Sequence, residues 1–450
     1  MANQATSKAS DPANIKKLTI NSNESGNIDV KDATTRLMYY ESILQDAVRA
    51  SVTFVDSGNS INDKTVIDGL PLVGQEKVQL KFVDNLENEL ELDLYVNKVT
   101  PIADDTTKSM VSMDLTSKEF IMNEKVRLNT RFDGKISDHI NKILTDSNYL
   151  GTDKEIDIEE TSNNYNFIGN NRKPYYALNW LSKKAVSAEN QKKGTSAGYF
   201  FYETSEGFFF KSIDGLLSQE KKKSIIYNQS PDKRGESVPE GYDVKALDYQ
   251  KDNNVNVQEK LQMGAYSTRT VLFDPFTCYY EVKVENADSQ QEDLKLGGKK
   301  LPKLNAEFNR EGNNKEFSRT QYRLLDKGSL PTGSGTGASQ EQLTKSKDEN
   351  LEAKDVLNQS IRRYGQLFSA KSSITIPGDF SLHAGDVIFL DAPSLQKKTK
   401  NDDINKESGG LYIIADLCHY ISPKETYTKL NLVRDSFGRK GNHSSGNTQL

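Results

Sequence analysis

Apolar and polar residues alternate along several segments of the chain, and this alternation most limits the fold that the chain can adopt. It begins near Ala50 and is clearest at Val78, Leu80 and Phe82, at Leu90, Leu92, Leu94 and Val96, and at Val111, Met113 and Leu115. Side chains that alternate with a period of two point to opposite faces of a β-strand, so each segment is typical of a half-buried antiparallel strand. Turn-forming stretches at 84–88 and 104–107 separate the segments. We therefore predict a small antiparallel meander or barrel.

The period changes to 3.6 in two later segments. Between residues 132 and 150, one helical face carries Ile136, Ile140, Ile143 and Leu144. A second helix is expected to begin at Pro174, a favoured first-turn residue, with one side formed by Leu178, Leu181 and Ala185. These helices predict a separate, small α-rich domain.

Strands return in an aromatic hairpin at 198–211, in which residues 204–207 form the turn. A short helix follows, with Ser212 as its N-cap. Four further strands are expected at 373–377, 385–391, 410–419 and 427–433. Because a lone hairpin is marginally stable, we expect the aromatic hairpin to pair with this C-terminal block and form a second barrel, split in sequence by an insertion.

These segments predict a mainly β, α+β protein with two antiparallel β-barrels and with helical and irregular inserted domains. The predicted domains are a flexible N-terminus (1–18), a first barrel (19–122), an α-rich domain (123–196), a split second barrel (197–249 plus 365–438), an insertion (250–364) and a flexible C-terminus (439–450). The insertion contains a Gly/Ser-rich linker (327–347), and a helix is expected around 351–368.

Composition limits the function. The chain of 450 residues has 59 Lys and Arg against 64 Asp and Glu, and its net charge of -5 argues against a dedicated nucleic-acid binder. Cys278 and Cys418 lie 140 positions apart, without metal-type spacing, and are expected to be reduced and buried. The N-terminus is polar, and no apolar run in the chain is long enough to span a membrane. We therefore expect a soluble protein made in the cytosol.

Catalytic patterns are sparse, and we assign no catalytic, cofactor-binding or metal-binding residues. The stretch 194–198 matches the GxSxG pattern around Ser196, but a strand follows it where a nucleophile elbow needs a helix. The glycine run 333–337 lacks the Lys-Ser/Thr of a phosphate loop. Other weak candidates are better explained as helix-surface, strand or solvated loop residues; they are the four histidines (His139, His383, His419 and His443), the acidic pairs 159–160 and 402–403, and the lysine run 221–223.

Three segments nevertheless resemble a known family. The block 374–388, followed by 409–419 and 428–438, resembles the C-terminal region of baseplate hub proteins from contractile-tailed phages. The segment 199–216 is similar to the mid-chain hairpin of that family, and 113–121 to the end of its first barrel. The resemblance covers about 50–220 and 355–438, and its motifs are packing motifs, which indicate a fold family more than a chemistry.

The resemblance implies a structural, non-enzymatic hub located in the virion, at the tail baseplate, and assembled in the host cytoplasm. The resemblance also implies that both barrels are of tail-tube type. Three copies would form a ring of six similar barrels that adapts the hexameric tail tube above to the trimeric central spike below. Wedge or inner baseplate proteins would also bind it, phage DNA would only pass through the lumen, and no membrane insertion of its own is expected. We expect the lumen wall to be acidic or polar so that it does not bind DNA.

Two alternatives from other classes stay open. The insertion 250–364 could hold a tail-associated peptidoglycan hydrolase, although it is rich in Lys, Glu and Asn and poor in aromatic residues. The chain could also be a receptor-binding or secretion-system spike protein that shares the pair of barrels. The resemblance to hubs favours the structural adaptor.

Overall fold

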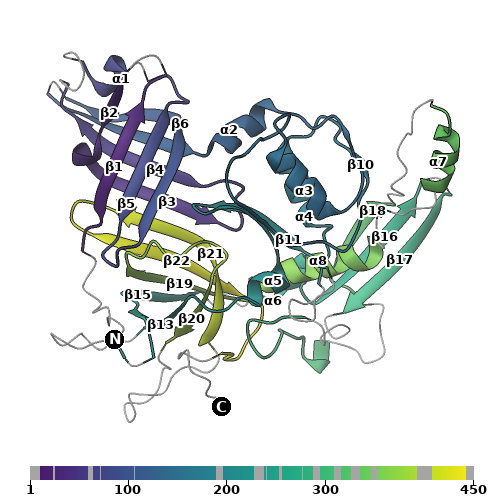
Figure 1. Ribbon diagram of the computed structural model, residues 1–450. Coiled ribbons are helices and arrows are strands. Elements are labelled where there is room, and N and C mark those ends of the chain that lie inside the picture. Colours follow the sequence, from purple (N-terminus) through teal and green to yellow (C-terminus); the bar gives the residue numbers. More distant parts are fainter. Residues whose placement is uncertain are drawn as a thin grey trace, which may run out of the picture.

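The computed structural model describes residues 11–23, 26–58, 64–70, 72–105, 107–188, 196–227, 238–239, 241–252, 256–275, 277–286, 294–308, 316–325, 335–345, 350, 353–392 and 408–441. These residues are mainly β, as predicted. Figure 1 shows a large sheet in two halves, a helical region beside it, and a separate three-stranded sheet at the far side of the molecule.

Fourteen strands form the large sheet. Its first half contains β1 (Asn14–Asn21), β2 (Asn27–Asp29), β3 (Thr34–Ser42), β4 (Arg49–Asp56), β5 (Lys77–Val83), β6 (Glu89–Asp104) and β7 (Ser109–Thr116), with the 3-10 helix η1 (Lys31–Ala33) after β2 and the short helix α1 (Val66–Gly69) after β4. Its second half contains β13 (Lys223–Ile226), β14 (Val244–Lys245), β15 (Asp248–Asp252), β19 (Ala370–Pro377), β20 (Val387–Asp391), β21 (Gly410–Ile421) and β22 (Thr426–Arg434). Every strand predicted from alternation is present.

The first half has the strand order β3-β4-β7-β6-β5-β1-β2 and encloses its own apolar core. The alternating residues face this core, because Val78, Leu80 and Phe82 are buried while their neighbours in β5 are half-exposed. The predicted flexible N-terminus is wrong from Asn14 onward, since β1 pairs with β5 and buries Leu18 and Ile20. Residues 1–10 lie outside the described residues.

The second half is bridged by one stretch of chain. β14 pairs with β13, and β15, three residues further on, pairs with β19. Between them, Ala246 N donates to Ile226 O and Leu247 N donates to Thr375 O, so residues 244–252 contact both ends of the path β13-β20-β21-β22-β19. In the described residues no sheet closes on itself through a complete ladder, and the two barrels remain a prediction.

β21 joins the two halves. Its first residues pair with β20, its later residues pair with β3 from Asp416–Ser42 to Ile421–Leu37, and β22 pairs along its other side. A register shift between Ile414 and Asp416 separates the two sets of partners. The halves are therefore one continuous sheet through backbone hydrogen bonds.

A helical region covers the aromatic hairpin. It contains α2 (Lys118–Lys125), β8 (Arg131–Phe132), α3 (Ile136–Thr145), β9 (Ile156–Ile158), β10 (Phe167–Ile168), α4 (Pro174–Ser182), β11 (Tyr199–Thr204), β12 (Gly207–Ser212) and α5 (Ile213–Leu217). The predicted apolar faces of α3 and α4 are buried in one core. Ser212 caps α5 as expected, because its Oγ accepts from Gly215 N at 2.8 Å.

The predicted pairing of the hairpin with the C-terminal strands is wrong. β11 and β12 pair with each other, and β12 pairs in parallel with β9, so the hairpin forms a separate three-stranded sheet. The reason is that both faces of the hairpin are apolar. Tyr199 and Phe201 pack into the helical core, whereas Phe200 and Tyr202 pack against the C-terminal strands through side chains alone.

The insertion has its own sheet and helices. They are α6 (Val257–Met263), β16 (Ser267–Asp274), β17 (Tyr279–Asn286), the 3-10 helix η3 (Ala306–Phe308), β18 (Arg319–Leu324), α7 (Ala338–Lys345) and α8 (Ala353–Leu367). Part of the predicted linker is helical, because α7 lies within 327–347; residues 326–334 and 346–349 lie outside the described residues. The predicted flexible C-terminus is also wrong at Arg439, which binds the buried Asp391 at 2.8 Å; residues 442–450 lie outside the described residues.

Candidate functional site

One row of side chains crosses eight strands of the large sheet. The paired positions, from β6 to β15, are Tyr95, Thr116, Arg49, Tyr40, Cys418, Lys429, Thr375 and Asp248. We call the eight strands β6-β7-β4-β3-β21-β22-β19-β15 the shared strip. Because neighbouring positions such as Leu37, Val52 and Leu417 point into the apolar cores, this row lies on the opposite side of the strip, which we call the open face.

The open face is polar, hollowed and of mixed charge. A hollow of about 670 Å³ crosses β3, β21 and β22, where the Tyr420 and Tyr427 rings stack with their centroids 4.5 Å apart. Lys98 lies opposite Asp114 on neighbouring strands. Positive and negative side chains are therefore both present on this face, and no single sign dominates the described positions.

The shared strip ends in two edges without strand partners in the described part of the chain. β6 pairs with β5 only up to Tyr95, so the side of residues 98–104 that faces away from β7 is unpaired. At the other end, β15 pairs with β19 alone. Unpaired strand edges can add a further strand, so each end of the strip can pair with another chain.

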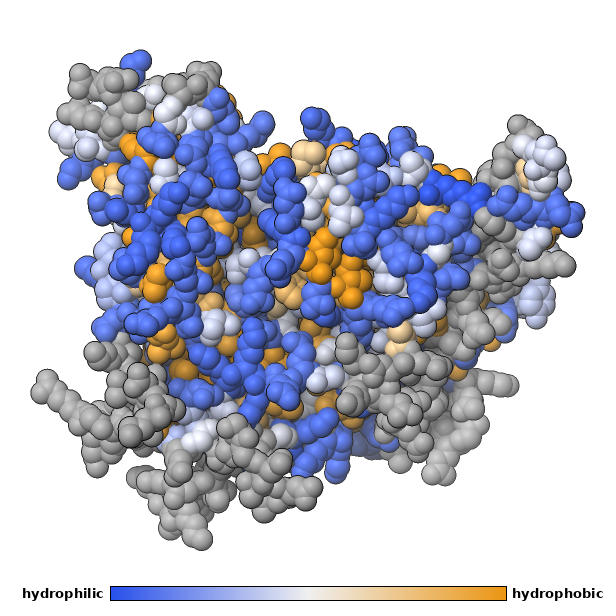
Figure 2. Space-filling model, viewed as in Figure 1, coloured by the Kyte–Doolittle hydropathy of each residue, from blue (hydrophilic) through white to orange (hydrophobic). Residues whose placement is uncertain are grey.

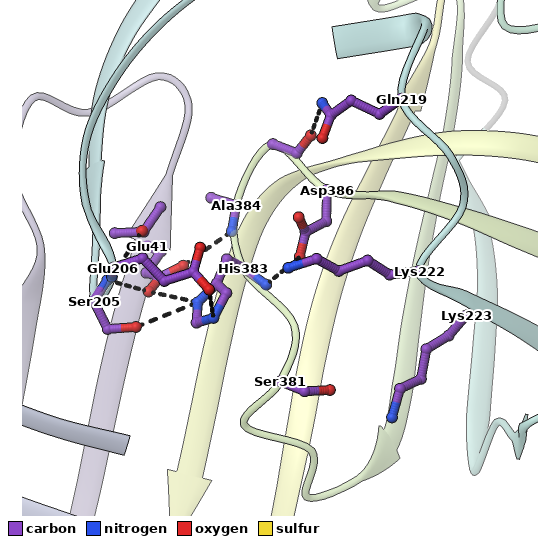
Figure 3. Close-up of polar contacts among 12 residues, drawn as sticks. Glu41, Ser205, Glu206, Gln219, Lys222, Lys223, Ser381, His383, Ala384 and Asp386 are labelled. Atoms are coloured by element: carbon purple, nitrogen blue, oxygen red, sulfur yellow. Dashed lines mark hydrogen bonds and ion pairs between the residues drawn. The ribbon is translucent and has the colours of Figure 1, made fainter. Parts of the chain in front are cut away.

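A buried polar cluster fixes the strip to the hairpin. Glu41 of β3 accepts from Ser205 N in the hairpin turn at 2.8 Å and from Ala384 N in the loop 378–386 at 2.9 Å. His383 Nδ1 lies 3.3 Å from the same carboxylate, and its Nε2 lies 3.5 Å from Glu206. Figure 3 shows these residues converging from three segments. One buried carboxylate thus joins parts of the chain that are far apart in sequence.

The cluster contains an ion pair. Burial alone would lower the pKa of His383, but Glu41, Glu206 and Asp386 outweigh it and raise this pKa above its usual value. Burial alone would raise the pKa of Glu41, but His383 and the backbone N–H groups of Ser205 and Ala384 hold this pKa below its usual value. Each partner therefore stabilises the charged form of the other.

The cluster does not have the geometry of a Ser-His-acid triad. Such a triad places the serine on Nε2 of the imidazole and a buried carboxylate alone on Nδ1. Here Ser205 Oγ and Glu41 Oε1 both lie 3.3 Å from His383 Nδ1. The arrangement suits a clamp between segments.

The loop 378–386 extends this clamp. Phe380 enters the core of the first half, where its ring packs on the edge of Phe82, and its N–H donates to Asp84 at 2.8 Å. Gly385 has φ +90°, and a Cβ there would lie 2.2 Å from the Tyr202 hydroxyl, so the position requires glycine. These contacts hold the loop against both halves of the sheet.

The lysine run binds the same loop. Lys222 lies 2.9 Å from Asp386, and Lys223 in β13 lies 2.5 Å from the buried Asp379. The interpretation of 221–223 as a solvated loop is therefore wrong, because two of the three lysines neutralise carboxylates of the clamp.

The remaining sequence candidates are structural. Ser196 is buried, and its N–H donates to Asp214; Gly194 and Thr195 lie outside the described residues. Glu159 is buried and accepts from Ser187 and Ser212, while Glu160 pairs with Lys135 at the surface.

Among the histidines and cysteines, His139 and Cys278 differ from expectation, whereas His419 lies in a strand as predicted. His139 is buried where a surface position was predicted, and its ring bonds to Tyr165 O at 2.8 Å. His419 lies in β21 and bonds to Thr428 at 2.9 Å. Both cysteines are free, but Cys278 is exposed where burial was predicted. His443 and the acidic pair 402–403 lie outside the described residues.

The ranges that the structure describes contain neither a candidate metal-binding group nor a helix suited to cross a membrane. In them, no three His, Cys, Asp or Glu side chains are grouped so that they could hold a metal ion. None of their helices combines the length and apolarity needed to cross a membrane. Figure 2 shows a mostly hydrophilic surface on the viewed side, with hydrophobic side chains between the polar ones.

The chain is similar to solved structures of tail proteins. No family model and no curated protein matches its sequence. A 43 kDa tail protein of a Shewanella oneidensis prophage matches with TM-score 0.49 and 8% identity, over 93% of this chain and 98% of that one. A Neisseria meningitidis tail protein matches with TM-score 0.49 and 8% identity, over 93% and 96%. A type VI secretion component of E. coli matches with TM-score 0.45 and 8% identity, over 96% and 79%. At these values the likeness does not by itself assign a function.

Proposed function

We propose that this chain is a structural hub of a contractile phage tail baseplate and works as a trimeric ring. The ring would adapt the hexameric tail tube above it to the trimeric spike below it, with wedge or inner baseplate proteins around it. Phage DNA would only pass through its lumen. The resemblance of three sequence segments to baseplate hubs gives the class of protein, and the shared strip supplies a physical basis for the assembly.

The shared strip is the observation that carries this proposal. It is one continuous sheet with two unpaired edges. When copies join edge to edge, every edge gains a strand partner only if the last copy pairs with the first and closes a ring. Each copy contributes two sheet halves of seven strands each, so three copies contribute six. A threefold ring of this kind would present six related units to a hexameric tube.

The open face suits the wall of a channel. Its polar side chains of both signs, such as Arg49, Lys429 and Asp248, would give DNA no continuous positive surface to bind. We therefore place the open face toward the lumen.

Native mass spectrometry with negative-stain microscopy tests the proposal. The expected result is a ring with three times the chain mass of 50.5 kDa. A monomer at micromolar concentration would overturn it. The hydrolase alternative for 250–364 stays a prediction, and zymography on the same preparation tests it.

A further inference from the structure

The three-stranded sheet of the insertion has one apolar face that no described residue covers. β16 lies between β17 and β18, and its alternate residues Thr268, Thr270 and Leu272 are buried on the side of α8. The other face carries Arg269, Val271 and Phe273 of β16, with their cross-strand partners Val284, Val282 and Tyr280 of β17 and Thr320, Tyr322 and Leu324 of β18. We call this the outer face.

Large side chains on the outer face are exposed. Tyr322 is 75% exposed, Leu324 70% and Tyr280 63%. With Phe273 and Val282, the exposed apolar area is about 500 Å², taking roughly 200 Å² for a large side chain. Contiguous apolar patches of this size on soluble proteins mark interaction sites.

The layers of the insertion indicate what should cover the outer face. β16 pairs in parallel with β18 and antiparallel with β17, so the sheet is mixed. α8 packs on one face of the sheet, and a helix on the other face would complete a helix–sheet–helix arrangement of layers. Three strands of six residues present a face about 14 Å by 20 Å, which matches one helix of about 14 residues.

The longer segments that adjoin the strands of this sheet and lie outside the described residues are 287–293, 309–315 and 326–334. Their sequences contain Leu330 as their single large apolar residue and so carry no apolar helical stripe. We therefore assign the covering helix to another polypeptide.

Arg269 indicates the charge of that helix. Its guanidinium lies over the Phe317 ring at 4.9 Å, at one end of the outer face. Arg269 is the single charged residue among the nine paired positions of the outer face. A carboxylate on the incoming helix would therefore complement its charge.

We propose that the outer face is a docking site for one amphipathic helix of a partner protein, about four turns long, with an aliphatic stripe and an acidic residue at the end that meets Arg269. This site goes beyond the proposed ring, because it lies on the insertion and uses neither edge of the shared strip.

Fluorescence anisotropy with labelled 16-residue peptides tests the site on the full chain. The first probe is a designed helix with leucines at i, i+3, i+4 and i+7 and glutamates on its flanks. The second has lysines for the glutamates, and the third has serines for the leucines. The acidic leucine helix is expected to bind with micromolar Kd, at least tenfold tighter than the serine peptide and several-fold tighter than the lysine peptide.

Two variants locate the binding. Tyr322→Ser with Leu324→Ser should weaken the acidic helix at least tenfold, and Arg269→Gln should abolish the preference for the acidic over the basic helix. The matched control is Leu44→Ser with Val73→Ser, which changes two exposed apolar side chains elsewhere and should leave binding unchanged.

Three outcomes would overturn the site. They are equal binding of the leucine and serine peptides, binding that the Tyr322 and Leu324 substitutions leave unchanged, and a self-association that those substitutions abolish, which would make the occupant a second copy. If the Tyr322→Ser, Leu324→Ser variant keeps the trimer mass, a loss of peptide binding concerns the outer face alone and leaves the proposed ring untouched.

Discussion

Arg363 of α8 and Asp214 of α5 form an ion pair with no exposed side-chain area, in which Nη2 lies 2.8 Å from Oδ1. Nη1 of the same guanidinium lies 2.9 Å from Asp435, which follows β22 and is also fully buried. Nη2 donates in addition to the main-chain oxygen of Lys295 at 3.0 Å. One side chain therefore ties the insertion to the hairpin and to the end of the large sheet.

Replacing Arg363 with methionine should destabilise the protein by about 3–5 kcal/mol, because two buried carboxylates lose their counter-charge. The free energy of unfolding from urea titration measures the effect. Arg323→Met, at an exposed position of β18, is the control and should stay within about 0.5 kcal/mol. A loss below about 1 kcal/mol in the Arg363 variant would contradict the structural role.

The Glu41–His383 pair predicts a pH dependence. The folded pKa of His383 is raised, so its contribution is complete below the unfolded value of about 6.5 and is lost as the pH rises through the folded value. The folded pKa of Glu41 is lowered, so its contribution is lost as the pH falls below the usual carboxyl range. His383→Gln should therefore cost roughly 1–3 kcal/mol near pH 6 and less at pH 9, measured by urea titration at each pH.

His419 predicts a pH dependence of stability opposite to that of His383. Burial lowers its pKa to about 4, so the folded protein holds it neutral. The protein should therefore lose stability as the pH falls below about 6.5, because the unfolded chain then binds a proton at this position that the folded protein does not. His419→Gln should remove that loss. If both histidine variants showed the same pH trend, the assigned charge states would be incorrect.

Lys154 neutralises two buried carboxylates of the hairpin region. Its Nζ lies 2.8 Å from Glu119 and 2.5 Å from Glu203, whose side chain has no exposed area. Lys154→Met should destabilise the fold by about 2–3 kcal/mol at pH 7. Burial raises the pKa of Glu203, so its protonation should shrink this loss as the pH falls. Lys211→Met, which removes a pair with the exposed Asp157, should show little change in urea titrations at either pH.

The local elements were predictable because their signals are local. The alternation at Val78, Leu80 and Phe82 follows from a strand with one buried face, and the stripe at Ile136 and Ile140 from an amphipathic helix. The hairpin itself was predicted correctly, but its sheet partner was not. A segment with two apolar faces satisfies its burial against any apolar surface, so its sequence does not select β9 over the C-terminal strands.

The buried clamp could not be predicted in the same way. Glu41 and His383 are 342 positions apart, and each would be unremarkable as a surface residue. One local signal was available: Glu41 falls in the alternating run with Leu37 and Tyr39, which puts a carboxylate on a buried face. A charge in that position requires a partner, although the sequence does not say which one.

The edges of the shared strip give the last prediction. If β6 of one copy pairs with β15 of the next, facing residues have Cα atoms about 4.5–5.5 Å apart, which is within the range for a disulfide. We expect at least one of four cysteine pairs, Lys98 or Thr100 with Asp248 or Gln250, to form covalent dimers and trimers under oxidation. A Cys278→Ser background removes the exposed native thiol, and each single cysteine is the control on non-reducing gels. A trimer in which none of the four pairs forms a disulfide would rule out every register that places Lys98 or Thr100 opposite Asp248 or Gln250.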